Sequence, residues 1–175
     1  MQAFDPAAHA ATLARVAAAG VDIAPFPALR AQDPQALERL HALRGALSRD
    51  VPGTEAHTVE PLASLAAYFE ASPSARPGSW MVARQGEAYV GLTSCWGSHG
   101  QPDRLHTGLT GVLPCVRRQG VATALKVAAI GYAQRAGVRV LDTENEESNP
   151  MYRLNLALGF VPRPAWLVYR RTLPR

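Results

Sequence analysis

Residues 112–123 read VLPCVRRQGVAT, and this stretch decides the fold. An apolar strand end is followed by a short turn and by an Arg-x-x-Gly-x-Ala loop that opens a helix. The first amides of a helix have no partner within it and lie at the positive end of its dipole, so phosphate binds there readily. Gly120 lacks a Cβ, which lets the backbone approach a bulky diphosphate. Arg117 and Arg118 add guanidinium donors. The stretch therefore predicts a pyrophosphate seat and a nucleotide-type cofactor.

The helix after this loop is well marked. Apolar residues recur at helical spacing from Val121 to Tyr132, and Ala136-Gly137 supplies a stop signal. A P-loop would need Gly-Lys-Ser/Thr and a dinucleotide fold would need Gly-x-Gly-x-x-Gly, and the sequence has neither. An ordinary strand-turn-helix with two surface arginines is the alternative interpretation of this segment taken alone.

A second segment narrows the interpretation. A strand-like run, VRVLDT, covers residues 138–143, and residues 144–160 read ENEESNPMYRLNLALGF. Together the two segments resemble the GNAT family, the Gcn5-related N-acetyltransferases that use acetyl-CoA. Arg117-x-x-Gly120-x-Ala122 looks like the family's pyrophosphate loop, and Leu158-Gly159-Phe160 looks like its late helix-to-strand signature. The detailed match covers roughly residues 80–171.

A narrower resemblance is carried by Thr110-Gly111-Val112, Thr143-x-Asn145, Asn149 and Asn155. These positions look like those of a bacterial subgroup, in which the domain is often the C-terminal module of tandem GNAT proteins. The resemblance implies an α/β (α+β) fold with a mixed, mostly antiparallel central sheet flanked by helices. It also implies acetyl-CoA as the acyl donor, with no metal. The residues expected to contact the cofactor are Gly111, Val112, Arg117, Arg118, Gln119, Gly120, Val121, Ala122, Thr123, Asn145, Asn149 and Asn155.

One departure from the family concerns the general acid. Many members carry a tyrosine five residues before the phenylalanine of Leu-Gly-Phe, where it protonates the departing CoA thiolate. Here that position is Asn155, as in the subgroup. Tyr152 lies one turn earlier on the same helix face and is the candidate substitute. The alternatives are that Tyr152 is a packed aromatic residue and that Asn155 only satisfies local backbone.

The general base is a second departure, because the strand before the loop lacks the glutamate that is frequent in the family. It offers His106 and the hydroxyls of Thr107 and Thr110. Glu144 follows the neighbouring strand, together with Asp142, Glu146 and Glu147. The candidate catalytic residues are therefore Glu144, His106 and Tyr152. The alternatives are that the glutamates begin a helix, whose dipole favours them, and that His106 is a half-buried strand residue.

The chain divides into an N-terminal helical arm, residues 1–20, and a single domain, residues 21–175. Helices are expected over 7–19 and 33–48 and from Thr58, and a loop over 98–103. Strands are expected over 21–26, 79–84, 88–96, 105–113, 138–143 and 165–173. The acceptor pocket is expected to involve residues 48–58, where Asp50 attracts an amine or serves as an ordinary turn acid. The alanine-rich arm gives rise to a homodimer hypothesis.

Composition excludes several function classes. The net charge of +4 comes without a basic run interleaved with aromatics, so nucleic acid is not an expected partner. No apolar run nears 18 residues and no signal pattern is present, which predicts a cytoplasmic protein without a membrane partner. The two cysteines form no disulfide framework, and the histidines lack metal-ligand spacing.

The sequence thus predicts an acetyl-CoA-dependent N-acetyltransferase that acts on an amine of a small molecule or protein. A non-catalytic acyl-CoA-binding module is the alternative function. A phosphate-binding module for another nucleotide is a third.

Overall fold

A computed structural model describes residues 4–51, 59–164 and 171. Its centre is one five-stranded sheet in the order β1-β2-β3-β4-β5. The strands are β1 (Val21–Pro25), β2 (Met81–Gln85), β3 (Ala88–Ser98), β4 (Gln101–Val112) and β5 (Val140–Asp142). β1 to β4 pair antiparallel, and β5 alone is parallel to its neighbour β4. The prediction of a mixed, mostly antiparallel sheet is confirmed.

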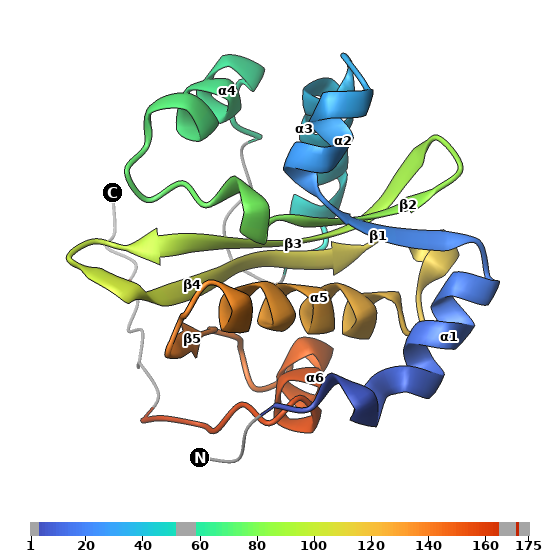
Figure 1. The fold of residues 1–175 in the computed structure, drawn as a ribbon, viewed down its shortest axis with the longest axis vertical. Coiled ribbons are helices and arrows are strands. Elements are labelled where there is room, and N and C mark those ends of the chain that lie inside the picture. The colour runs from blue at the N-terminus through green and yellow to red at the C-terminus, as the bar shows by residue number, and fades with distance from the viewer. Residues whose placement is uncertain (1–3, 52–58, 165–170, 172–175) are drawn as a thin grey trace.

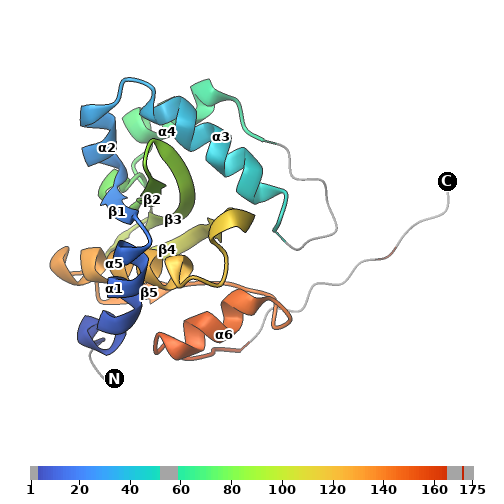
Figure 2. The ribbon, with the colours of Figure 1, turned by 90° about the vertical axis from the view of Figure 1, so that its right-hand side faces the viewer.

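Helices cover both faces of the sheet (Figures 1 and 2). One face carries α2 (Phe26–Gln32), α3 (Ala36–Ser48) and α4 (Leu62–Ala71). The other carries α1 (Ala10–Ala18), α5 (Val121–Arg135) and α6 (Pro150–Ala157). Because successive strand residues point to opposite faces, the sheet has a core on each side. Leu40, Leu65 and Leu92 belong to the first core, and Leu105 and Leu125 to the second.

The helix predictions hold in outline. Asp5 accepts a hydrogen bond from the Ala7 amide at 2.9 Å, and a single 3₁₀ turn, Pro6–His9, leads into α1. α3 covers most of the predicted segment 33–48. The helix expected from Thr58 begins at Leu62, and Thr58 itself lies outside the described residues. The short helix α2 was not expected, because its segment contains Pro27 and has no polar cap.

The prediction of a loop over residues 98–103 was wrong. β3 continues to Ser98 and β4 starts at Gln101, so the two strands form a hairpin that turns at His99-Gly100. Gly100 has φ 72°, which suits a tight turn. The polar residues of this hairpin resemble a loop in sequence, but the strand ladder satisfies their backbone. For the last predicted strand, residues 165–170, 172 and 173 lie outside the described part of the chain.

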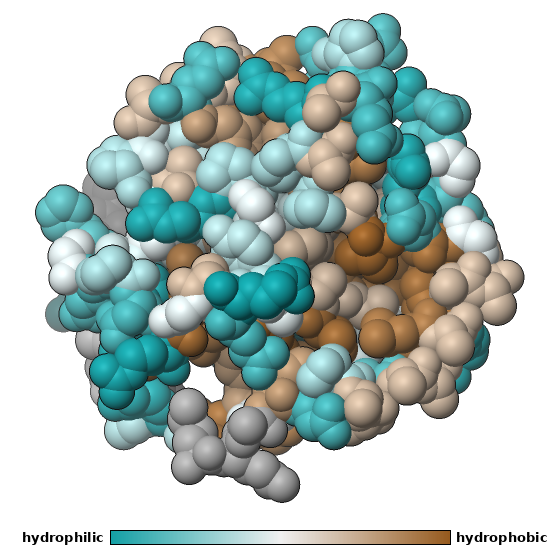
Figure 3. Space-filling model, in the orientation of Figure 1, coloured by the Kyte–Doolittle hydropathy of each residue, from teal (hydrophilic) through white to brown (hydrophobic). Residues whose placement is uncertain are grey.

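The N-terminal arm packs on the sheet face that carries α5. Val16 of α1 is buried beside Val21 and Val121. Figure 3 shows hydrophobic side chains gathered between β1 and α1, with the paler residues of the arm at their rim. Ala11, Ala14, Ala17 and Ala18 of α1 are exposed. The homodimer hypothesis, which rests on such a surface, stays a prediction.

Two negative findings concern the described residues 4–51, 59–164 and 171. No helix among them is long and apolar enough to cross a lipid bilayer. No group of three or more His, Cys, Asp or Glu side chains there is placed to hold a metal ion.

Candidate active site

β4 and β5 pair over only a short length and then separate. Their register joins Arg104 to Val140, Leu105 to Leu141 and His106 to Asp142. β4 runs on to Val112, while β5 ends at Asp142. Among the described residues, no strand pairs with this edge of β4 from Thr107 to Val112. Unpaired strand edges offer N–H and C=O groups to an extended ligand.

A bulge interrupts β4 on this free stretch. Thr93 of β3 faces Thr110, and Cys95 faces Thr107, so Gly108 and Leu109 together oppose the single residue Ser94. Bulges of this kind occur next to active sites, where they turn side chains and backbone groups out of the ladder. A Cβ on Gly108 would lie 2.6 Å from Cζ3 of Trp96, so only glycine fits there.

The helix α5 begins with free amides, as the sequence predicted. Gly120 is its N-cap with φ 91°, no side chain caps it, and its first turn contains no acid. The first backbone amide satisfied from inside the helix is that of Ala124, which donates to the Gly120 carbonyl at 3.0 Å. Among the described residues, the amides from Arg118 to Thr123 meet no acceptor. This helix start has unsatisfied donors and a positive dipole end, with no acidic side chain in its first turn.

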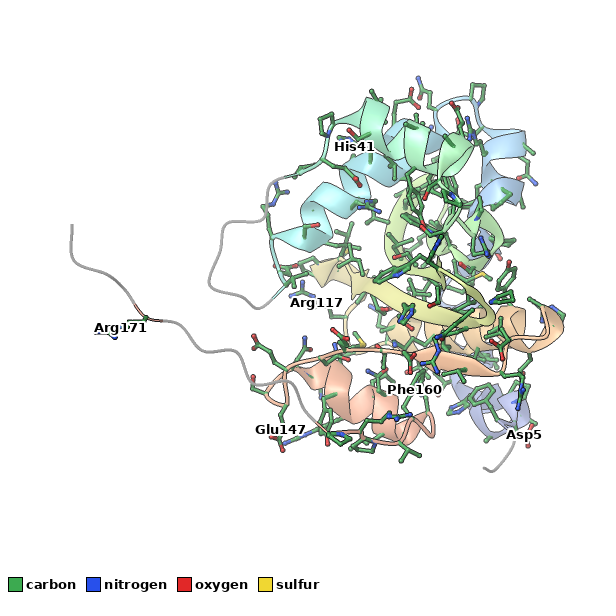
Figure 4. The ribbon with its side chains drawn as sticks, turned by 90° about the vertical axis from the view of Figure 1, so that its left-hand side faces the viewer. Asp5, His41, Arg117, Glu147, Phe160 and Arg171 are labelled. Atoms are coloured by element: carbon green, nitrogen blue, oxygen red, sulfur yellow. The ribbon has the colours of Figure 1, made fainter. Side chains whose placement is uncertain are left out.

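Arginines surround this helix start. Arg118 is exposed and has φ 62°, an uncommon conformation for a non-glycine residue. Nη2 of Arg117 lies 2.5 Å from Oδ2 of Asp50, which the sequence had suggested for the acceptor amine. Asp50 is thus an ion-pair partner in this loop. In Figure 4, Arg117 and Glu147 lie on the same side of the molecule, with Glu147 below Arg117.

The arm α1 explains part of the need for glycine at position 120. A Cβ on Gly120 would lie 2.6 Å from Cγ2 of Thr12 and 3.1 Å from Nη2 of Arg15. The sequence suggested that glycine at position 120 leaves room for a diphosphate. In the structure, side chains of α1 occupy the space into which a Cβ at this position would point. Arg15, which is exposed, becomes a third cation beside the start of α5.

Replacing Gly120 with alanine is expected to lower the free energy of unfolding by about 1–3 kcal/mol, because a Cβ meets Thr12 and φ is positive. Urea denaturation measures this loss. Gly137→Ala is the matched control, since Gly137 also has positive φ but open space around a Cβ. Equal losses for the two variants would contradict tight packing of the arm.

On the far side of the β4–β5 gap, two predicted asparagines meet. Nδ2 of Asn155 donates to Oδ1 of Asn145 at 2.5 Å, and Asn155 is buried on α6. Its own Oδ1 has no hydrogen-bond partner among the described residues. Asn149, also expected to contact the cofactor, instead accepts a hydrogen bond from the Met151 amide at 2.9 Å and caps α6. The alternative that Glu144, Glu146 and Glu147 begin this helix was wrong, because α6 starts at Pro150.

The three catalytic candidates lie in different surroundings. His106 is half-buried on β4, where its Nδ1 is 3.8 Å from Oδ2 of Asp142 and its ring stacks on Trp96. Glu144 is exposed after β5, without a hydrogen bond or ion pair to the described residues. Tyr152 is half-buried on α6, and its ring joins neither a hydrogen bond nor a stack among the described residues.

The hydroxyl alternatives for the base are already engaged. Thr110 Oγ1 lies 2.7 Å from Thr93 Oγ1, a hydrogen-bond distance. Thr107 makes a side-chain hydrogen bond with Cys95. Burial raises the pKa of the Cys95 thiol to about 11, and the hydrogen bond from Thr107 opposes this rise in part. His106 is therefore the ionisable side chain of β4 closest in sequence to the bulge.

A cleft of about 260 Å³ opens at the bulge on the α3–α4 side of the sheet. It brings together residues from five segments far apart in sequence. They are Arg44, Glu60, Leu65, Tyr68, Trp80, Ser94, Trp96, Gly108 and Leu109. The acceptor pocket predicted near residues 48–58 stays a prediction, because residues 52–58 lie outside the described residues, and the sequence did not point to these side chains. Gly108 within a strand was the one available signal, since such a glycine often marks a bulge or a close approach.

Comparison with known proteins agrees with this geometry. Residues 40–160 match the acetyltransferase (GNAT) family. The aminoglycoside N-acetyltransferase AAC(6')-Iy in complex with CoA superposes with a TM-score of 0.62 at 18% identity, covering 86% of this chain and 94% of that one. Its complex with a bisubstrate analogue gives 0.61 at 22% identity, covering 87% and 99%.

A third solved structure, Ard1 from Thermoplasma volcanium, gives a TM-score of 0.60 at 17% identity, covering 83% of this chain and 85% of that one. No sequence among the curated proteins is a significant match. At these identities the solved structures establish the fold, and the family match extends over more than half of the 175 residues. The chain belongs to the acetyltransferase (GNAT) family.

Proposed function

We propose that this protein is an acetyl-CoA-dependent N-acetyltransferase that acetylates a primary amine. The start of α5 carries the proposal, because Arg15 and Arg118 lie beside its free amides and no acid lies in its first turn, while Arg117 pairs with Asp50. Such an arrangement is unfavourable unless an anion binds. The diphosphate of acetyl-CoA is that anion, and its pantetheine arm runs along the free edge of β4.

The residues of the site supply each step of the transfer. The thioester carbonyl accepts a hydrogen bond from a backbone amide of β4 near Gly111 or Val112, which stabilises the developing oxyanion. The amine nitrogen attacks the carbonyl carbon, the N–C bond forms and the C–S bond breaks. His106 takes the proton of the amine, and the Asp142 carboxylate, which is paired with Arg104, lies 3.8 Å from its Nδ1. The thiolate leaves and takes a proton from Tyr152 or water.

Asn145 and Asn155 form the opposite wall of this proposed site. The unpaired Oδ1 of Asn155 is buried at the gap and has the capacity to accept a hydrogen bond from an amide of pantetheine. Of the other predicted contacts, Gly111 and Val112 lie on β4 and Asn149 caps α6. The rest lie on the loop and the first turn of α5, where Gln119 donates a hydrogen bond to the Cys115 carbonyl at 3.1 Å.

Titration calorimetry with CoA, followed by thiol release from acetyl-CoA over a panel of amines, tests the proposal. Arg118→Glu is expected to weaken CoA affinity about tenfold or more, because it replaces a charge-assisted donor with a repelling carboxylate. Arg135→Glu, at the opposite end of α5, is the matched control. Unchanged affinity in the Arg118 variant would contradict the diphosphate seat.

A non-catalytic acyl-CoA-binding module is the second candidate function. One observation favours it: Asn155 occupies the position of the usual acid and is buried in a hydrogen bond with Asn145. CoA binding without thiol release for any amine would support this module over the enzyme. Stabilisation by ATP or NAD, with none by CoA, would instead support a site for another nucleotide.

A further inference from the structure

The cleft on the α3–α4 side reaches the β4 bulge, which precedes the strand residues proposed to hold the thioester. Gly108 and Leu109 line the cleft, and the same two residues form the β4 bulge beside the free strand edge. His106, the proposed base, stacks on Trp96 with ring centroids 5.9 Å apart, and Trp96 also lines the cleft. An amine held in this cleft therefore lies beside the base and beside the edge along which the thioester is proposed to run.

Three of the nine residues that line the cleft are aromatic. Trp80 is fixed in place, because its Nε1 donates to the Cys95 carbonyl at 3.1 Å and its ring is covered by the Arg44 guanidinium at 5.0 Å. Tyr68 lies 5.9 Å from Trp80 between ring centroids. Trp96 is 42% exposed, which is unusual for a tryptophan on a central strand. An exposed aromatic ring at the mouth of a cleft is suited to contact with an apolar ligand.

The charges of the cleft cancel. Glu60 supplies its only carboxylate among the described residues, and this carboxylate forms an ion pair with Arg44. Among the described residues that line the cleft, a polycationic ligand therefore finds no unpaired acid. Desolvating an ammonium group without a counter-charge costs several kcal/mol. A monoamine avoids that cost, because it loses its proton before it attacks the thioester.

The size of the cleft sets a further limit. Pockets for drug-sized ligands have volumes of roughly 300–1,000 Å³, and this cleft holds about 260 Å³. This volume matches one ring or a branched aliphatic group with a short chain.

We infer that the acceptor is a small aromatic or bulky aliphatic primary monoamine, whose apolar part contacts Trp96 and Tyr68 and whose nitrogen points to the β4 bulge. This inference rests on the proposed acetyltransferase function. The acetyl group passes from the sulfur of CoA to the amine nitrogen, and His106 removes one proton. The acceptors of AAC(6')-Iy, an aminoglycoside N-acetyltransferase, carry several amines and belong to a different class.

Steady-state thiol release with phenylethylamine, spermidine and kanamycin tests the inference. The value of kcat/KM for phenylethylamine is expected to exceed both others by about tenfold or more, because the additional ammonium groups of spermidine and kanamycin would have to be desolvated without a counter-charge. Quenching of tryptophan fluorescence by phenylethylamine, with CoA present, measures binding separately from turnover. A higher kcat/KM for spermidine or kanamycin, or no binding of phenylethylamine, would overturn the inference.

Two substitutions test whether a change in activity comes from the cleft or from a general loss of structure. Trp96→Ala is expected to raise KM for phenylethylamine about tenfold while CoA affinity stays unchanged. Leu156→Ala is the control, because Leu156 is equally exposed, at 41%, on α6 outside the cleft. Arg44→Gln frees the Glu60 carboxylate and is expected to raise kcat/KM for spermidine relative to phenylethylamine. No shift in this ratio would overturn the role given to the Arg44–Glu60 pair.

The same measurements distinguish failure of the inference from failure of the proposed function. Binding of phenylethylamine without thiol release for any amine would reject the enzyme and keep the ligand class of the cleft. Thiol release that favours polycations would keep the enzyme and reject the ligand class.

Discussion

Replacing His106 with alanine is expected to lower kcat by about 100-fold to 10,000-fold, the range that general base catalysis contributes. The reason is positional: His106 lies on β4 before the bulge, with its Nδ1 3.8 Å from the Asp142 carboxylate. The affinity for CoA is expected to stay unchanged, because His106 is not among the residues proposed to bind the cofactor. Thiol-release kinetics at saturating acetyl-CoA measure the effect.

A second substitution separates the base from the stacking role of the same ring. His106→Phe keeps an aromatic ring on Trp96 but removes both nitrogens. We expect the loss in kcat to match that of the alanine variant while KM for the acceptor is retained. Added imidazole is expected to restore activity to the alanine variant and not to the phenylalanine variant. An active phenylalanine variant would show that another group, such as Glu144, takes the proton.

Replacing Lys126 with methionine is expected to stabilise the protein at pH 7 by up to about 3 kcal/mol. Lys126 is 3% exposed on α5 and has no acidic partner among the described residues. Its ammonium lies 5.1 Å from the centroid of the Phe160 ring, and burial lowers its pKa to about 8. Figure 4 labels Phe160 on the α5–α6 side of the sheet.

The lowered pKa of Lys126 also determines how the free energy of unfolding changes with pH. Below about pH 8 Lys126 is protonated in both the folded and the unfolded state, so the folded protein bears the full cost of a buried charge. From about pH 8 to the unfolded pKa of about 10.4, the unfolded state binds the proton more strongly, so stability rises with pH. The advantage of the methionine variant is therefore expected to shrink across this window.

Urea denaturation of both proteins at pH 7 and at pH 9.5 measures that difference. Cys95 acts in the opposite direction, because its pKa is raised to about 11 and its contribution to stability falls as the pH rises above its unfolded value. It is present in both proteins and largely cancels in the comparison. Arg135→Met, an exposed position of the same helix, is the control. A difference between wild type and Lys126→Met that does not change with pH would contradict the lowered pKa.

Much of the fold was predictable because its signals are local. The turn at Gly120 and the start of α5 followed from a glycine and from helical spacing, and the structure gives Gly120 φ 91° at the N-cap. The apolar runs of β2 and β3 marked two strands of the sheet. The hairpin end near His99 was missed, because its polar residues look like a loop until the ladder of β3 and β4 is formed.

The candidate site was only partly predictable. The loop residues around Gly120 are contiguous, so a short motif was enough to find them. Asp50 and Arg117 were each noted, but their ion pair joins positions 67 apart in sequence. The cleft residue Trp80 lies just before β2 and Trp96 lies on β3, and no local pattern relates either of them to Glu60.

The sequence by itself determined where backbone donors are available for an anion, since the amides of a helix start are left unpaired by the geometry of the helix itself. Only the tertiary structure decided what surrounds those donors and what faces the bulge. Packing placed the arm α1 against Gly120 and brought Arg44, Glu60 and Trp96 to one cleft. Such contacts arise from the way that helices settle on a twisted sheet, and that arrangement depends on the whole core rather than on any one segment.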